Sequence, residues 1–175
     1  MRYLTLGGFL LIAASAAFAQ TQPITSASKD QLIEKLAPPP RSAVRSRNLT
    51  ISAVKVEEET AASSGSVDLS IQFDFNSSRL QDESKPLLNT LAEALQSEQL
   101  NSYRFKIEGH TDAKGNDGYN RRLSLQRAEA VAVFMKNKGI KSSRISTTGM
   151  GASQLLFPDK PLAQENRRVR ITVIQ

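Results

Sequence analysis

The sequence predicts an α+β domain in which two helices pack on one face of a mixed sheet of about four strands, a two-layer sandwich. Two patterns carry this prediction. Short segments between residues 66 and 175 alternate apolar with polar residues, the two-residue period of a strand that is buried on one face. Longer segments between them repeat apolar residues at helical spacing. Helices that alternate with strands act as crossover connections, so they are expected to cover the sheet.

The strands and helices of this domain can be placed one by one. The first strand has the longest alternation, which runs from Val67 to Phe75. The second helix is expected to close at Gly139, because glycine readily adopts the left-handed conformation that ends a helix. In chain order, the expected elements are a strand at 67–75, a helix at 82–99, a strand at 103–108, a helix at 119–138, and strands at 145–148 and 168–173.

Residues 1–19 have the three parts of a secretory signal peptide. A basic start is followed by a short apolar stretch and by the small-residue ending Ala17-Phe18-Ala19. The apolar stretch is shorter than the ~20 residues that a membrane-spanning helix needs. We therefore expect cleavage before Gln20, export to the periplasm, and no membrane-spanning segment in the mature chain.

Residues 20–65 are poor in aromatic residues and rich in Ser, Thr, Ala and Pro, which is typical of a flexible linker. A short helix is possible at 28–36, with Ser28 as its N-cap. The whole segment is expected to lack stable packing. A flexible chain of this length spans roughly 35 to 40 Å, so it could let the domain search its surroundings while an envelope protein partner holds the linker.

The overall charge suits an anionic partner. The net charge is +6 and the pI is about 9.8. Predicted export excludes nucleic acid, which leaves lipid headgroups, lipopolysaccharide and the cell wall. The chain has no cysteine, so it has no disulfide, no thiol nucleophile, no Cys-based metal site and no acceptor for a lipid anchor. Any association with the outer membrane is therefore expected to depend on a partner.

One charged residue interrupts the apolar side of the second predicted helix. At 100° per residue, Arg127 falls within the stripe that contains Leu123, Val131 and Phe134. Burying an unpaired guanidinium is costly, so Arg127 must reach past the helix end or face a carboxylate. Asp112, in the loop before this helix, is the nearest candidate in sequence.

The residues alone leave two interpretations of this pair open. Asp112 and Arg127 could form a salt bridge that fixes the loop to the helix. They could instead line a pocket, where Arg127 offers a planar fork of donors to a carboxylate and Asp112 offers acceptors to an ammonium. In the second case the pair would recognise a zwitterionic amino-acid centre.

A dense set of residues around this pair resembles the signature of the OmpA-like domain, and the resemblance covers about residues 66–175. The matching residues are Gly109-His110-Thr111-Asp112, Gly115, Tyr119-Asn120, Leu123-Ser124 and Arg127-Ala128, together with Phe73-Asp74-Phe75-Asn76, Gly149-Met150-Gly151 and Asn166-Arg167-Arg168-Val169. The resemblance implies a non-catalytic binder of peptidoglycan, similar to peptidoglycan-associated lipoproteins and flagellar stator proteins. It also implies that Asp112 and Arg127 hold the diaminopimelate residue of the stem peptide.

Four further residues are expected at secondary positions of this site: Asp74, Thr111, Asn120 and Arg167. Asp74 follows the first strand on its polar side, and Thr111 and Asn120 flank the main pair. Arg167 shares strand parity with Val169, so it is expected to point toward the helix face. Each of the four could alternatively serve as a loop or capping residue.

The sequence predicts no catalytic residue, no metal site and no cofactor. His110 is the only histidine, and it has neither a nucleophile–base arrangement nor a second metal ligand at a recognisable spacing. A competing hypothesis is a periplasmic protein-interaction module that keeps the fold without binding the wall.

Overall fold

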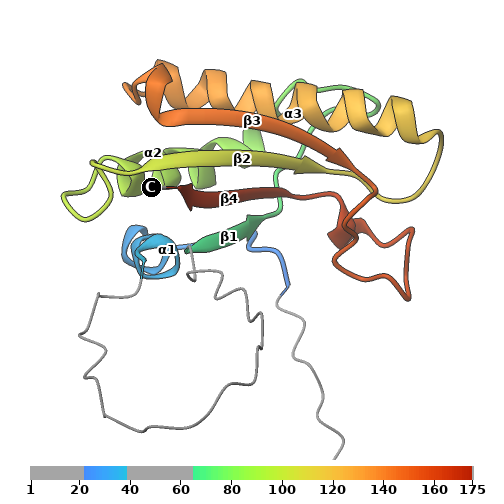
Figure 1. Cartoon of the computed structure of the whole chain (residues 1–175), viewed down its shortest axis with the longest axis horizontal. Coiled ribbons are helices and arrows are strands. Elements are labelled where there is room, and N and C mark those ends of the chain that lie inside the picture. The colour runs from blue at the N-terminus through green and yellow to red at the C-terminus, as the bar shows by residue number, and fades with distance from the viewer. Residues whose placement is uncertain (1–21, 39–64, 175) are drawn as a thin grey trace, which may run out of the picture.

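The structure of the 175-residue chain is a computed structural model that describes residues 22–38 and 65–174 (Figure 1). The predicted signal peptide, 1–19, and the larger part of the predicted linker, 39–64, lie outside the described residues.

A four-stranded mixed sheet forms one layer of the domain. Its strands are β1 (Ser66–Leu69), β2 (Arg104–His110), β3 (Ile145–Gly151) and β4 (Val169–Ile174), in the spatial order β1-β4-β2-β3. The central strand β4 runs antiparallel to both β1 and β2, whereas β2 and β3 are parallel. A parallel pair needs a crossover connection, and α3 supplies it.

Two helices, α2 (Lys85–Leu95) and α3 (Asp117–Asn137), cover one face of the sheet (Figure 1). The core lies between the two layers, where Phe105 and Ile171 from the sheet and Leu91 and Val131 from the helices are fully buried. Burying an aliphatic or aromatic side chain of this size stabilises the fold by about 1.5–3 kcal/mol. The predicted α+β sandwich of two helices on a mixed sheet is therefore confirmed.

The first strand is much shorter than its alternation predicted. β1 stops at Leu69, because Leu69 pairs with Val169 and Val169 is the first residue of β4. Beyond Leu69 the chain leaves the sheet: the Ser70 amide donates to the Ile24 carbonyl, and Phe73 then forms an isolated antiparallel bridge with Leu80. Phe75, the last residue of the predicted strand, is 99% exposed. Alternation therefore continued past the point where pairing with β4 ended.

Residues 22–38 are folded into the domain, so the prediction that residues 20–65 lack stable packing is wrong for this part. The possible helix at 28–36 is present as α1 (Lys29–Leu36), with a capping box between Ser28 and Gln31. Its Leu32 and Leu36 side chains are fully buried, and α1 contacts α2 and β1. Composition suggested a linker because this helix contributes only one apolar side to the core.

The segment before α1 is held along the outer edge of β1. Ile24 forms a parallel bridge with Leu69, in which the Ile24 amide donates to the Asp68 carbonyl at 2.8 Å. The Ser70 amide donates to the Ile24 carbonyl at 2.9 Å. This pairing satisfies backbone groups that an edge strand would otherwise leave open.

The two ends of the undescribed segment 39–64 lie next to each other. A Cβ atom added at Gly65 would be 2.2 Å from the carbonyl oxygen of Leu36, so the two backbones are in contact. Residues 39–64 therefore join two neighbouring points of one domain. The predicted span of roughly 35 to 40 Å was that of a flexible linker between the domain and a distant attachment point. Residues 39–64 do not connect two such distant points.

Truncating Leu36 tests whether α1 is part of the folded domain. Leu36→Ala should lower the free energy of unfolding by about 2–5 kcal/mol, because it removes a fully buried side chain and leaves a cavity. Glu34→Ala, on the exposed side of the same helix, is the matched control and should change stability by less than about 0.5 kcal/mol. Denaturant unfolding measures both, and equal effects would mean that α1 does not pack.

An ion cluster lies on the sheet face away from the helices. Asp68 accepts from Arg168 Nε at 2.8 Å and from Arg170 Nη2 at 2.8 Å. The Arg168 side chain is only 2% exposed, and it also donates to the carbonyls of Gln154 and Asn166 in the loop before β4. Burial by itself raises the pKa of Asp68, but the hydrogen bond from Arg170 and the charges of both arginines outweigh it, so the pKa lies below its ordinary value.

His110 is buried beside this cluster and makes stability depend on pH. Burial, together with the positive charges of Arg168 and Arg170, lowers the pKa of His110 to about 3. The unfolded chain therefore binds the proton more readily than the folded chain does. The contribution of neutral His110 to stability is fully present above about pH 6.5 and is lost as the pH falls toward 3.

We expect the free energy of unfolding to fall by about 2 kcal/mol between pH 7 and pH 5, at up to about 1.4 kcal/mol per pH unit. His110 is the only histidine, so a slope in this range can be assigned to it. His110→Gln should flatten the slope in denaturant unfolding curves recorded at several pH values. A slope that persists in the variant would assign the effect to other groups.

Candidate ligand-binding cleft

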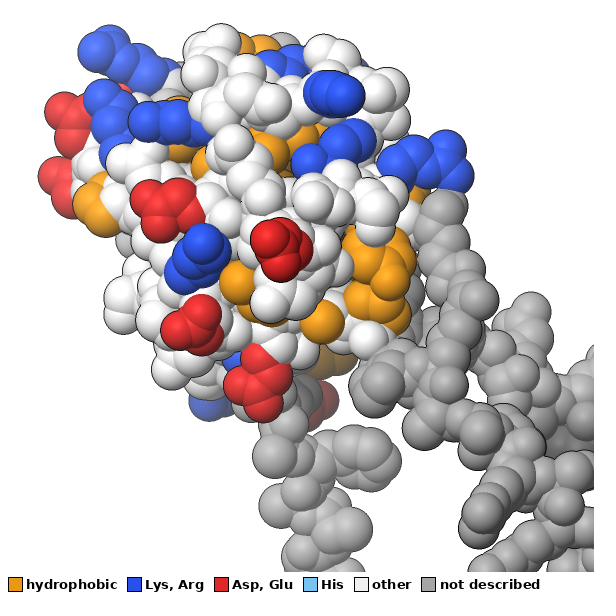
Figure 2. All heavy atoms as spheres, turned by 90° about the vertical axis from the view of Figure 1, so that its left-hand side faces the viewer, with side chains coloured by type: hydrophobic (Ala, Val, Ile, Leu, Met, Phe, Trp, Pro, Cys, Tyr) orange, Lys and Arg blue, Asp and Glu red, His pale blue; other side chains and the backbone are white. Residues whose placement is uncertain are grey.

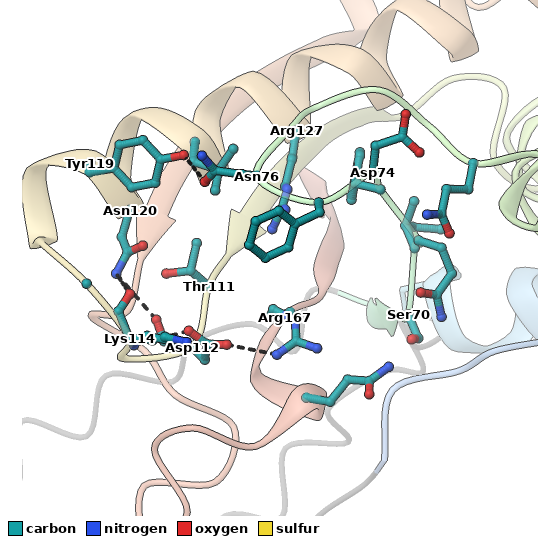
Figure 3. A pocket seen from close by; sticks show the side chains of 18 residues that line it. Ser70, Asp74, Asn76, Thr111, Asp112, Lys114, Tyr119, Asn120, Arg127 and Arg167 are labelled. Carbon is teal, nitrogen blue, oxygen red and sulfur yellow. Dashed lines mark hydrogen bonds and ion pairs between the residues drawn. The ribbon is translucent and has the colours of Figure 1, made fainter.

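A cleft of about 620 Å³ opens at the end of the sheet where β2 stops and α3 begins (Figure 3). Its walls come from the turn after β1, from the loop between β2 and α3, and from the segment just before β4. All six residues that the sequence singled out line it: Asp74, Thr111, Asp112, Asn120, Arg127 and Arg167.

The opposite end of the domain has a different character. Figure 2 views that end and shows basic and acidic side chains separated by small hydrophobic areas. In this view (Figure 2) Lys and Arg side chains are more frequent in the upper part, and Asp and Glu side chains in the lower part. The cleft is therefore the stronger candidate for a binding site.

Glycines allow α3 to lie directly on the sheet beside the cleft. A Cβ atom at Gly109 would be 2.0 Å from the carbonyl oxygen of Ser124, and one at Gly149 would be 2.4 Å from that of Arg121. The Ser124 hydroxyl also accepts from the Gly151 amide at 2.9 Å. These residues of the sequence signature therefore have a structural role, which is to bring the end of β2 against the first turns of α3.

The loop between β2 and α3 is held by two asparagines. Asn116 caps α3, where its side chain accepts from the Tyr119 amide at 3.2 Å. Asn120 is buried, and its side-chain nitrogen donates to the carbonyl of Lys114 at 3.0 Å. The side-chain amide of Asn120 therefore stabilises the loop. A role as a loop residue is the alternative that the sequence left open for it.

Asp112 has both carboxylate oxygens engaged. Oδ1 accepts from the Lys114 amide at 3.1 Å, and Oδ2 accepts from Arg167 Nη1 at 2.8 Å (Figure 3). Its side chain is 14% exposed. The salt bridge that the sequence left open, between Asp112 and Arg127, is not formed; the partner of Asp112 is Arg167.

Arg127 enters the cleft from α3 without a carboxylate partner among the described residues. Its Nε donates to the Ser77 carbonyl at 3.0 Å, and its guanidinium lies 5.0 Å from the centre of the Phe73 ring, a cation–π contact. Burial lowers the pKa of Arg127, and the nearby positive charge of Arg167 adds to the effect. The half-buried guanidinium is thus oriented for an anion from outside the chain.

The remaining predicted residues differ in what they offer to the cleft. Thr111 is 3% exposed, and its hydroxyl has no hydrogen-bond partner in the described part of the chain. The Asp74 side chain is 45% exposed, and its carboxylate lies 3.7 Å from Arg79 Nε. Figure 3 shows that this carboxylate points away from Asp112 and Arg167. Thr111 is therefore placed to meet a ligand, whereas Asp74 borders the cleft without facing its centre.

Sequence reasoning missed the aromatic side of the cleft. Phe73 was assigned to a strand, yet its ring forms a cation–π contact with the Arg127 guanidinium. The Tyr119 hydroxyl donates to Asn76 Oδ1, and Asn76 has a φ of 55°, in the left-handed region that asparagine tolerates better than most residues. The Asn-Ser-Ser run after Phe75 is a turn signal that could have ended the predicted strand earlier.

Two other kinds of site were tested on residues 22–38 and 65–174. No three His, Asp or Glu side chains are grouped there so as to hold a metal ion. In the same residues, no helix combines the length and hydrophobicity needed to cross a membrane.

Known proteins resemble this chain in sequence and in fold. The chain is 38% identical over 105 residues to the outer-membrane lipoprotein YfiB of Pseudomonas aeruginosa, which is 59% of this chain and 61% of that protein. The chain thus spans less than two thirds of the length of this relative.

Solved structures agree with this likeness. The OmpA-like domain of FopA1 from Francisella tularensis has a TM-score of 0.54 at 26% identity, over 62% of this chain and 70% of that one. The peptidoglycan-associated lipoprotein of Burkholderia pseudomallei has a TM-score of 0.52 at 29% identity, over 59% of this chain and 88% of that one. Residues 72–169 match the model of the OmpA family, and the protein therefore belongs to that family.

Proposed function

We propose that this protein binds peptidoglycan non-covalently and without catalysis, holding the diaminopimelate residue of the stem peptide in the cleft. One observation carries the proposal: Arg127, which lacks a carboxylate partner among the described residues, faces the same cleft as Asp112. A family member of similar structure is named a peptidoglycan-associated lipoprotein, which supports the wall as the ligand.

The chemistry of the cleft fits the free end of a diaminopimelate residue. That end carries one ammonium and one carboxylate on the same carbon. The Arg127 guanidinium can donate two parallel hydrogen bonds to the carboxylate, and Asp112 can accept from the ammonium. The Thr111 hydroxyl, which has no partner in the described chain, can add one more hydrogen bond.

The proposal extends to location. Binding the wall requires export, so the protein would act in the periplasm, with its contribution to envelope integrity or anchoring made through wall contact. YfiB is named an outer-membrane lipoprotein, and an outer-membrane association of this chain would depend on a partner protein.

Comparing two wall types tests the proposal. Lysine-type stem peptide lacks the carboxylate that Arg127 would bind, so it should bind at least about tenfold more weakly than the diaminopimelate type, since a hydrogen bond to a charged group contributes about 1.5–3 kcal/mol. Calorimetry with L-Ala-γ-D-Glu-meso-diaminopimelate and its lysine analogue gives the ratio. Equal affinities would reject the diaminopimelate assignment, and no binding to either would favour a protein-interaction module.

A further inference from the structure

We propose that Arg167 is an internal counter-ion that occupies the ammonium-binding side of Asp112 until a ligand ammonium replaces it. This inference rests on the proposed function and adds how the cleft selects its ligand. Binding would be an exchange, in which one internal ion pair gives way to new pairs with the ligand.

The geometry places the two cationic groups in unequal positions. Arg167 Nη1 lies 2.8 Å from Asp112 Oδ2, on the carboxylate oxygen that the Lys114 amide does not use. Within residues 22–38 and 65–174, in contrast, the hydrogen-bond acceptor of Arg127 is a backbone carbonyl, and its guanidinium lies over the Phe73 ring. A ligand carboxylate can therefore approach Arg127 directly. A ligand ammonium, in contrast, must first displace Arg167 from Asp112.

The backbone that carries Arg167 is fixed, while its side chain is partly exposed. Asn166, which is fully buried, accepts from the Phe157 amide at 2.9 Å and donates to the Lys160 carbonyl at 2.9 Å. The side chain of Arg167 is 41% exposed. The guanidinium can thus leave Asp112 by rotation of the side chain, without movement of the loop.

Exchange is favourable only for a ligand that carries both charges. An ammonium alone would displace Arg167 from Asp112 and leave it beside Arg127, a like charge in the same cleft. A carboxylate on the same ligand would meet both arginines, which removes that repulsion. The Asp112–Arg167 pair would therefore lower the affinity of the cleft for amines that lack a carboxylate, such as the lysine end of other stem peptides.

The test compares two peptides that differ only in the amine: L-Ala-γ-D-Glu-meso-diaminopimelate and the same peptide acetylated on the amine of its free end. The measured quantity is the ratio of the two Kd values in the wild type and in Arg167→Gln. If Arg167 competes with the ammonium, the ratio of acetylated to free peptide should rise about tenfold in the variant, since the amine no longer has to displace a charge. A contact that Arg167 makes with the ligand carboxylate while it is still paired with Asp112 affects both peptides and cancels.

Arg79→Gln is the matched control, because Arg79 is also an arginine paired with a carboxylate that lines the cleft, Asp74. It should leave the ratio unchanged. A second measurement follows the guanidinium NMR signals of Arg167. They should show loss of the hydrogen bond to Asp112 when the free peptide binds and its retention with the acetylated peptide.

Three outcomes are distinct. A raised ratio with release of Arg167 supports the exchange. An unchanged ratio, or an Arg167 signal that stays hydrogen-bonded in the complex, would show a permanent salt bridge and overturn the inference while the proposed function stands. A wild-type protein that binds neither peptide would reject the proposed function and this inference together.

Discussion

Asp112→Asn is expected to weaken binding to diaminopimelate-type wall by about 30-fold to several-thousand-fold, because losing one partner of a buried charge pair costs about 2–5 kcal/mol. The asparagine keeps the shape of the side chain and can still accept from the Lys114 amide. What it removes is the charge that would meet the ligand ammonium. Sedimentation with purified sacculi and calorimetry with the diaminopimelate peptide measure the loss.

Asp74→Asn is the control for this variant. Asp74 lines the same cleft, but its carboxylate is half exposed and directed away from Asp112, so binding should change by less than about threefold. If Asp112→Asn lowered thermal stability while the folded protein still bound sacculi, Asp112 would have only a structural role as the partner of Arg167.

Asp68→Asn should lower the free energy of unfolding by about 3–5 kcal/mol, because it leaves the buried Arg168 guanidinium without its countercharge. Asp68 also pairs with Arg170, whose side chain is 29% exposed and can turn toward water. The Arg168 side chain is 2% exposed and cannot turn toward water in the same way. Denaturant unfolding at pH 7 measures the effect.

An exposed ion pair of the same chain supplies the control. Asp82 pairs with Lys85, and its side chain is 85% exposed, so Asp82→Asn should destabilise the fold far less than Asp68→Asn does. Similar losses for Asp68→Asn and Asp82→Asn would mean that the ion cluster beside β4 is not buried in solution. Arg168→Met, which replaces the charge by an apolar chain, should restore part of the stability lost in Asp68→Asn.

Local sequence pattern determined most of the architecture. The helix Asp117–Asn137 lies within two residues of its expected limits, since a long helix repeats its apolar positions over several turns. The cap at Ser28 and the left-handed Gly139 depend on neighbouring residues alone, so they too could be predicted. The six site residues that the sequence singled out could be predicted because they belong to the signature, and all six are among the residues that line the cleft.

Contacts between distant segments decided the rest. Where β1 ends depends on where β4 begins, and the folding of residues 22–38 depends on the contacts that α1 makes with α2 and β1. The sequence left a salt bridge between Asp112 and Arg127 open as one of two interpretations, yet the partner of Asp112 is Arg167, which lies 55 residues away. Pairing of charges follows distance in space, and only the tertiary structure brings the segment before β4 against the loop after β2.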